Sequence, residues 1–290
     1  MKIALFGKKF DDALMPFLEK LLSFFVRNNV EVLAIRPMYE FVCRRGMLDA
    51  RLRIAPFVTI LQETDADLLL SIGGDGTFLE SATYARGNVP IMGVNSGRLG
   101  FLSEVSQDDI EAALQSFFDG RFVTSKIDVI ALQSMDGEVI DFALNEFAVT
   151  KRDSSSMLTI HAYVNNEFLT TYWADGLIVS TPTGSTAYSM SVGGPIVHPA
   201  TPVFILTPIA PHNLTVRPLV VSNDVDVRLH IESRGRRLLT SLDGRMHLCD
   251  TNTCLQIKKA PFNVRVVQLP EHSFYATLRN KLMWGADKRN

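Results

Sequence analysis

The sequence predicts an α/β domain with a doubly wound, mostly parallel sheet, followed by a mostly β, sandwich-like domain. In the first half, short apolar runs alternate with segments whose apolar residues recur at helical spacing. In the second half, strand-like runs follow one another and are separated by turn dipeptides. We place the α/β domain at residues 1–120 and the β-rich domain at 121–272, and a helix expected at 273–284 can complete the first domain.

In the α/β domain the most informative element is the apolar run Ala66–Ile72. Its unbroken Leu68-Leu69-Leu70 indicates burial on both faces, which is typical of a parallel strand. Asp109–Phe118 has helical periodicity, and we expect its cap near Ser106 or Asp108. The other expected elements are the strands Lys2–Phe6, Val30–Ile35 and Pro90–Val94 and the helices Asp11–Arg27 and Phe78–Arg86. Residues 38–62 match no motif that we can interpret.

The β-rich domain is predicted from runs of strand-forming residues. They are Ile127–Gln133, Val139–Thr150, Leu158–Val164, Gly176–Ser180, Val225–Ile231 and Asn263–Leu269. Asp136-Gly137, Asn165-Asn166 and Asp243-Gly244 are dipeptides of the kind that close tight hairpins.

Composition excludes several classes of function. The 290 residues include 29 Lys and Arg and 31 Asp and Glu, so the formal charge is −2 and we expect no nucleic-acid partner. No apolar run reaches the roughly 18–20 residues that span a bilayer, so we expect no membrane association. The odd number of cysteines, three, favours reduced thiols and a cytoplasmic location. None of the six histidines has metal-ligand spacing, and we expect them to be structural.

The first candidate site is Gly73-Gly74-Asp75-Gly76-Thr77, which follows a buried strand and precedes a helix. Glycines allow a sharp turn with backbone N–H groups close to a ligand, and the helix start favours an anion, so a phosphate chain fits here. A carboxylate beside phosphates repels them unless it binds a metal or accepts a proton from an attacking hydroxyl. The alternative is that Asp75 simply caps the helix. The lysine of a Walker A loop is missing.

Two shorter motifs follow. Asn95-Ser96-Gly97-Arg98-Leu99-Gly100-Phe101 comes after the next strand, so its loop should open beside the first one, although a glycine-rich interdomain turn is an equal alternative. Asn145-Glu146 lies inside an expected strand, which would put one side chain on each face. An amide and a carboxylate can together hold a ribose diol, but a lone Asn-Glu pair is weak evidence.

The longest motif runs from Asp175 to Ser191. An apolar strand leads into a stretch of small residues with seven Ser or Thr between Ser180 and Ser191. Such a stretch is usually a loop, but the absence of charge and the central Tyr188 favour a surface for a polar ligand. Asp175, at the strand entrance, could accept a hydrogen bond from an amide or a hydroxyl.

Together and in this order, these segments closely resemble the NAD kinase family. Gly73–Thr77 is similar to its GGDGT loop, and Asn95–Phe101 to its N-x-G-x-L-G-F segment. Asn145-Glu146 resembles its NE pair, and Asp175–Ser189 its D-G-L-I-[IV]-S-T-P-T-G-S-T-A-Y-S signature. GGDGT is shared with lipid kinases and phosphofructokinases, whereas the long signature is specific to NAD kinases. The resemblance extends from Ile3 to Trp284.

The resemblance implies an enzyme that transfers the terminal phosphoryl group of ATP to the 2′-hydroxyl of the adenosine ribose of NAD, forming NADP. It also implies a divalent metal, Mg²⁺, held mainly by the nucleotide phosphates, and a homodimer or homotetramer. Asp75 is then the catalytic proton acceptor. The residues implied to bind NAD are Asp75, Gly76, Phe101, Asn145, Glu146, Ser156, Asp175, Thr186, Ala187, Tyr188, Ser189, Ser191 and Arg245. Those implied to hold the phosphates of ATP are Gly73, Gly74, Gly76, Thr77 and Asn95.

Three positions depart from the family pattern or blur it. Trp173 stands where many members carry a basic residue, so a basic contact to the substrate is missing or supplied elsewhere. Ser156 and Arg245 fall near family contact positions, but differences in loop length blur which family residues they correspond to.

The rival enzyme is a lipid kinase, which the polar Asp175–Ser191 stretch disfavours. The non-enzymatic rival is a dinucleotide sensor, which would not need Asp75.

Overall fold

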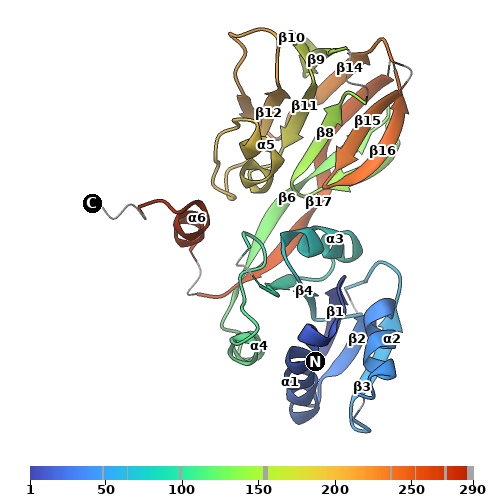
Figure 1. The fold of residues 1–290 in the computed structure, drawn as a ribbon, viewed down its shortest axis with the longest axis vertical. Coiled ribbons are helices and arrows are strands. Elements are labelled where there is room, and N and C mark those ends of the chain that lie inside the picture. Colours follow the sequence, from blue (N-terminus) through green and yellow to red (C-terminus); the bar gives the residue numbers. More distant parts are fainter. Residues whose placement is uncertain are drawn as a thin grey trace. The chain divides into compact units, whose positions relative to one another are not determined.

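The chain folds into two compact units. The structure is a computed structural model that describes residues 1–47, 49–63, 65–97, 100–152, 156–235, 237–251, 253–270 and 273–285 (Figure 1). The first unit comprises residues 1–126 and 264–290, and the second comprises residues 127–263. The division therefore falls at 126 and 263, where the sequence suggested 120 and 272.

The first unit is built on a parallel sheet. Its strands are β1 (Lys2–Gly7), β2 (Glu31–Ile35), β3 (Arg53–Phe57), β4 (Leu68–Ile72) and β5 (Ile91–Val94), in the order β3-β2-β1-β4-β5. Every residue of β4 is buried, as expected from its unbroken leucines. Parallel pairing brings the carboxyl ends of β4 and β5 to the same edge, where the two glycine-containing loops begin.

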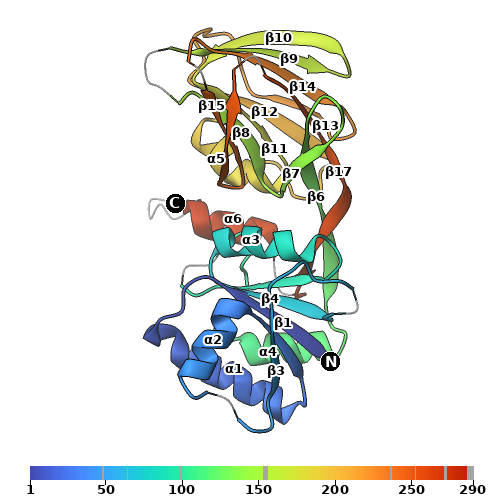
Figure 2. The ribbon, with the colours of Figure 1, turned by 90° about the vertical axis from the view of Figure 1, so that its right-hand side faces the viewer.

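The first unit also contains helices. They are η1 (Asp12–Leu14), α1 (Met15–Arg27), α2 (Arg36–Arg44), α3 (Asp75–Ala85), α4 (Ile110–Phe118) and α6 (Phe274–Leu282). Leu18, Leu21, Leu22 and Phe25 form the buried stripe of α1. α3 packs against β4 and β5, α2 packs against β2 and β3, and α1 packs against α4 (Figure 2).

The structure corrects three details of the first-half prediction. α2 and β3 lie in or beside residues 38–62, the segment that no motif identified; β3 is an edge strand and contains Pro56, which is tolerated there because an edge strand needs fewer N–H donors. α3 begins at Asp75 rather than Phe78. Asp109 is the N-cap of α4, and its backbone N–H donates to Ser106 Oγ (3.2 Å).

The second unit is a β-sandwich, so the predicted fold class is confirmed. One sheet has the order β13-β12-β11-β8-β15-β16. The other contains β10-β9-β14-β17, with β6 beside β17 and β7 beside β6. Alternate residues of both sheets meet in one apolar core that includes Phe147, Phe204 and Leu229. The strands are β6 (Val123–Gln133), β7 (Val139–Ala143), β8 (Glu146–Thr150), β9 (Leu158–Val164), β10 (Glu167–Ala174), β11 (Gly176–Ser180), β12 (Val203–Ile209), β13 (Leu219–Ser222), β14 (Val227–Glu232), β15 (Arg237–Leu242), β16 (Arg245–Asp250) and β17 (Thr253–Gln268).

Sequence patterns found about half of these strands. The structure adds β10, β12, β13, β15 and β16, and it divides the expected run 139–150 into β7 and β8. The predicted turns are confirmed: Asn165, Asn166 and Asp243 all have positive φ at hairpin ends. Two short helical segments, η2 (Thr183–Thr186) and α5 (Tyr188–Ser191), follow β11.

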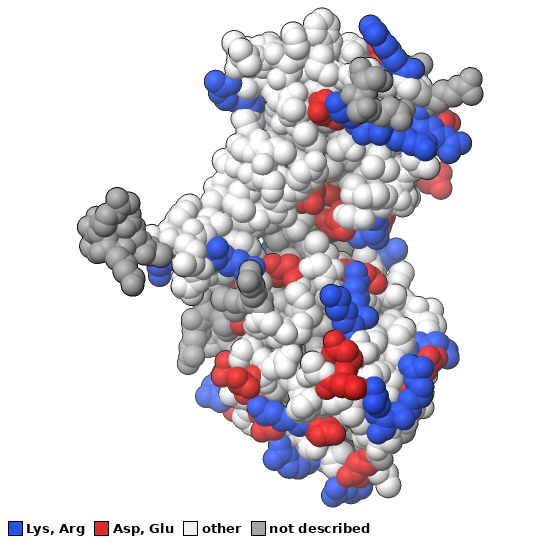
Figure 3. Space-filling view, in the orientation of Figure 1, with Lys and Arg blue, Asp and Glu red and all other residues white. Residues whose placement is uncertain are grey.

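The surface agrees with the near-neutral composition. On the face that Figure 3 shows, acidic and basic side chains are interspersed over the first unit, so this face presents no continuous basic surface to a polyanion. None of the helices in the described ranges is long and apolar enough to cross a bilayer.

Candidate active site

The glycine loop of the first unit leaves β4 and leads directly into α3. The backbone N–H of Gly73 donates to Val94 O (2.8 Å), which ties the end of β4 to the end of β5. Gly74 is the N-cap of α3. Gly74 and Gly76 are exposed, and a Cβ added at either would meet open space within 4 Å. The start of α3 is therefore an accessible helix N-terminus, which favours an anion such as phosphate.

Asp75 is held by the second loop rather than by its own helix. Its Oδ2 accepts a hydrogen bond from the N–H of Phe101 (2.8 Å). Its Oδ1 accepts from the N–H groups of Leu102 (3.0 Å) and Ser103 (3.1 Å). The alternative that Asp75 caps α3 is thus wrong, because the side chain makes no cap bond and Gly74 occupies that position. Three N–H donors fix the orientation of a partly buried carboxylate at the N-terminal end of the helix.

The second loop needs its glycine for this contact. A Cβ added at Gly100 would overlap the Asp75 carboxylate. Asn95, which is expected to hold phosphate, donates from Nδ2 to Val105 O (3.1 Å), a bond that stabilises the loop. Lys281 of α6 lies 5.4 Å above the ring of Phe101. Arg98 and Leu99 lie outside the described residues.

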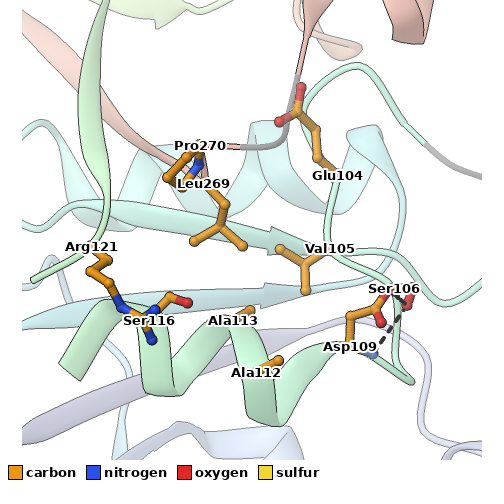
Figure 4. A pocket seen from close by; sticks show the side chains of 10 residues that line it. All are labelled: Glu104, Val105, Ser106, Asp109, Ala112, Ala113, Ser116, Arg121, Leu269 and Pro270. Carbon is orange, nitrogen blue, oxygen red and sulfur yellow. Dashed lines mark hydrogen bonds between the residues drawn. The ribbon is translucent and has the colours of Figure 1, made fainter. Parts of the chain in front are cut away.

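Glu104 is a neighbour of Asp75 that the sequence did not single out. Burial and the nearby negative charge of Asp75 raise the pKa of Glu104 to about 7 from its ordinary value of 4.5. Glu104 also lines a cavity of about 450 Å³ beside α4, together with Ser106, Asp109 and Arg121 (Figure 4). In Figure 4 its carboxylate points away from α4. Glu104 belongs to no motif, and the one signal in the sequence that could have identified it is its position next to this loop.

The second unit contains a carboxylate held in the same way. Asp243, at the turn between β15 and β16, accepts hydrogen bonds from three consecutive N–H groups: Leu144 (2.6 Å), Asn145 (2.8 Å) and Glu146 (3.1 Å). Burial raises the pKa of Asp243, although these N–H groups and Arg245 act in the opposite direction. This contact explains why the expected continuous strand breaks: Asn145 lies between β7 and β8, not inside a strand.

Asn145 and Glu146 carry polar atoms without partners. Among the described residues, Asn145 Oδ1, Glu146 Oε2 and Thr183 Oγ1 are buried and have no hydrogen-bond partner. Burial and the charge of Asp243 raise the pKa of Glu146 to about 8, despite the hydrogen bond from the Tyr188 N–H. A buried polar atom without a hydrogen-bond partner lowers the stability of the fold, so these atoms favour the binding of a polar ligand that forms hydrogen bonds with them.

The segment after β11 packs on this break. A Cβ added at Gly184 would overlap the carbonyl of Asn145, and Thr181 Oγ1 donates to Leu144 O (2.6 Å). Several hydroxyls expected to face a ligand are used internally: Ser185 with Val197, Thr186 with Thr183 O, and Ser189 with Thr207. The Ala187 N–H donates to Gly184 O (2.9 Å). Tyr188 and Ser191 are exposed.

The remaining expected residues are dispersed over the second unit. Asp175 pairs with Lys151, Oδ1 to Nζ 2.7 Å. Lys151 directly follows β8, so it places a cation beside Asp175, whereas Trp173, two residues before Asp175, carries no charge. Arg245 donates from Nε to Asp141 (3.0 Å) and from its guanidinium to Phe142 O. Ser156 and Trp173 line a separate cavity of about 590 Å³.

Comparisons with known proteins cover both units. The family model described as ATP-NAD kinase N-terminal domain matches residues 12–122, and that described as ATP-NAD kinase C-terminal domain matches residues 144–269. The chain is 43% identical over 297 residues to the NAD kinase of Cytophaga hutchinsonii, with all of both chains covered. Its fold is similar to that of yeast NADH kinase complexed with NADH, at TM-score 0.87 and 23% identity over 99% of this chain and 88% of that one. It is also similar to an NAD kinase from Archaeoglobus fulgidus in complex with ATP, at TM-score 0.76 and 25% identity over 98% and 99%.

Proposed function

The chain belongs to the NAD kinase family, whose reaction is the ATP-dependent phosphorylation of NAD, and from this premise we propose how its own residues carry out that reaction. The acceptor is the 2′-hydroxyl of the adenosine ribose, and Asp75 is the general base. The proton of that hydroxyl passes to the Asp75 carboxylate while the ribose oxygen bonds to the γ-phosphorus. The bond from that phosphorus to the ADP oxygen breaks, which gives NADP and ADP.

The geometry of Asp75 is the observation that carries this proposal. Oδ1 accepts two N–H groups and Oδ2 accepts one, so Oδ2 keeps a lone pair for a substrate hydroxyl. The carboxylate is fixed at the N-terminus of α3, next to the exposed Gly74 and Gly76 where a triphosphate would lie. A positioned base of this kind contributes roughly 10²–10⁴-fold to the rate.

The donor set at the loop fits a divalent metal such as Mg²⁺ only in part. Asp75 offers a hard oxygen ligand, but its two oxygens already accept three N–H groups, and Glu104 is partly protonated near neutral pH. Most ligands would therefore come from the nucleotide phosphates and water, as is usual for Mg²⁺. When bound, the metal neutralises charge on the transferred phosphoryl group.

In the second unit we propose that Asn145 and Glu146 bind the NAD. Glu146, with a pKa of about 8, is mostly protonated at neutral pH and can donate as well as accept a hydrogen bond. Asn145 Oδ1 is a buried acceptor without a partner among the described residues. Ribose hydroxyls and adenine nitrogens are suitable partners for such a pair. Asp175, oriented by Lys151, would accept from the nicotinamide amide.

We also propose a cytoplasmic homodimer or homotetramer. Cys43, Cys249 and Cys254 are free thiols, which suits a reducing compartment. Met246 and Leu248 project from the edge strand β16 and are 69% and 54% exposed, which gives a second copy an apolar surface to cover. Light scattering coupled to size-exclusion chromatography tests this: a monomer at micromolar concentration would contradict it.

The activity itself is tested by incubating the purified chain with ATP, Mg²⁺ and NAD and coupling the product to an NADP-specific dehydrogenase. The expected result is NADP formation that depends on both substrates. Phosphorylation of a diacylglycerol in place of NAD would support the lipid kinase, and NAD binding without ATP consumption would support the sensor.

A further inference from the structure

Two histidines and a glutamate meet on the outer face of the β9–β14 sheet. His161 and His230 are register partners on neighbouring antiparallel strands, and Glu232 is two residues further along β14. The core side of these strands is formed by alternate residues, such as Ile160, Leu229 and Ile231, so the histidines point outward. This cluster could not be predicted from the sequence, because the two histidines are 69 positions apart and only the strand register brings them together.

We propose that His161, His230 and Glu232 bind a divalent transition metal, with Zn²⁺ as the preferred ion. One possible ligand atom from each residue lies within 4.8 Å of the others. Glu232 Oε1 is 3.6 Å from His161 Nε2 and 3.9 Å from His230 Nδ1. Ligand atoms bonded at 2.0–2.1 Å to a tetrahedral Zn²⁺ lie about 3.3–3.4 Å apart, so small side-chain movements complete the geometry.

The ring of His161 is already oriented for this role. Its Nδ1 lies 2.8 Å from Thr171 Oγ1 on β10. If Nδ1 carries the proton and donates to Thr171, the Nε2 lone pair faces Glu232 and the His230 ring. Metal-bound histidines usually have such an outer partner, which fixes the tautomer and the ring orientation. The two rings are 5.7 Å apart and nearly parallel, at 22°.

The residue types select the kind of metal. Imidazole nitrogens prefer Zn²⁺, Ni²⁺ or Cu²⁺, whereas Mg²⁺ requires oxygen ligands. This set is therefore distinct from the metal proposed with ATP, and it lies on the sheet opposite to the one that carries Glu146. The side chains of His161, His230 and Glu232 are 27%, 37% and 48% exposed, so an ion can enter from solvent. A bound ion would cross-link β9 to β14, with a fourth position for water.

The test measures binding, so it does not depend on the proposed kinase activity. The purified full-length chain, stripped with a chelator, is titrated with Zn²⁺ against a chromophoric competitor. We expect one Zn²⁺ per chain bound by the wild type, and at least a hundredfold weaker binding in His161→Gln and His230→Gln. Thr171→Val removes only the outer partner and should weaken binding by about 10–100-fold. His198→Gln, an exposed histidine elsewhere in the second unit, is the matched control and should bind as the wild type does.

Thermal unfolding gives a second readout. Zn²⁺ at about a hundredfold excess over the wild-type Kd should raise the Tm of the wild type by several degrees and that of His230→Gln by about one degree at most. Equal Zn²⁺ affinity in the wild type and in the His161→Gln/His230→Gln double variant would overturn the proposal. So would a loss in His198→Gln as large as in the cluster variants.

Discussion

Asp75 in the first unit and Asp243 in the second accept the same pattern of backbone hydrogen bonds, but their surroundings differ. Each carboxylate accepts hydrogen bonds from three consecutive backbone N–H groups, 101–103 in one case and 144–146 in the other. Burial, together with the charge of the aspartate, raises the pKa of a neighbouring glutamate in each case: Glu104 beside Asp75 and Glu146 beside Asp243. Asp75 stands at an accessible helix start, whereas burial raises the pKa of Asp243 at a hairpin turn. We therefore propose that the same local bond pattern serves proton transfer in the first unit and chain positioning in the second.

The largest expected effect is on turnover in Asp75→Asn. The amide cannot accept the proton of the ribose hydroxyl, so kcat should fall by roughly 10²–10⁴-fold. One oxygen remains to accept from the loop N–H groups, and we expect the free energy of unfolding to fall by only about 1–3 kcal/mol. Steady-state kinetics and chemical denaturation of the same preparation separate these two effects.

Asp243→Asn should act mainly on stability. The substitution places an NH₂ group against buried N–H donors, so the free energy of unfolding should fall by about 2–4 kcal/mol. Because the break between β7 and β8 loosens, KM for NAD should also rise. Urea denaturation checks the first effect; a stability equal to that of the wild type would show that Asp243 does not hold this break.

How far the sequence predicted these two sites depends on where their partners lie. Asp75 could be identified from the sequence because the glycines next to it are typical of a phosphate-binding loop. The helix start that follows them is also visible in the local sequence. Asp243 was identified only as a turn residue, because its partners are 97–99 residues away and depend on the pairing of β8 with β15. The His161–His230 pair could not be predicted either, because its two members meet only through the pairing of β9 with β14. Edge strands such as β3, β13 and β16 were missed because exposure leaves them a weak apolar pattern.

Two glycines sharpen the comparison, because each makes room for one of the held segments. Gly100→Ala would push the Asp75 carboxylate aside, and displacement by about 1 Å can cost roughly 10²-fold in rate. Gly184→Ala would press on the Asn145 carbonyl and should cost about 1–3 kcal/mol of stability. Measuring both kcat and the free energy of unfolding on each variant compares the two effects directly. A Gly100→Ala enzyme with normal kcat would contradict the role given to Asp75's orientation.

A further expected effect is the pH dependence of stability. Glu104 and Glu146 have pKa values of about 7 and 8 in the folded chain against an ordinary 4.5, so the folded state binds more protons between these values. The contribution of these two groups to stability should therefore be greatest at and below about pH 4.5. Above that pH it should fall by roughly 1 kcal/mol per pH unit per group, and it should level off above each folded pKa. Glu104→Gln should remove the part of the loss of stability that occurs between about pH 4.5 and 7. Glu146→Gln should remove the part that occurs between about pH 4.5 and 8. Denaturation curves from pH 5 to 9 would show no such change if both groups titrate normally.

The central claim is that Asp75 accepts the proton of the ribose hydroxyl during phosphoryl transfer to NAD. The most direct measurement is a rapid-quench single turnover of enzyme-bound NAD with saturating ATP and Mg²⁺, made on Asp75→Asn beside the wild type, with the Kd for NAD measured on both. We expect a similar Kd and a rate constant for NADP formation at least about a hundredfold lower in the variant. A variant that forms NADP at the wild-type rate would contradict the claim.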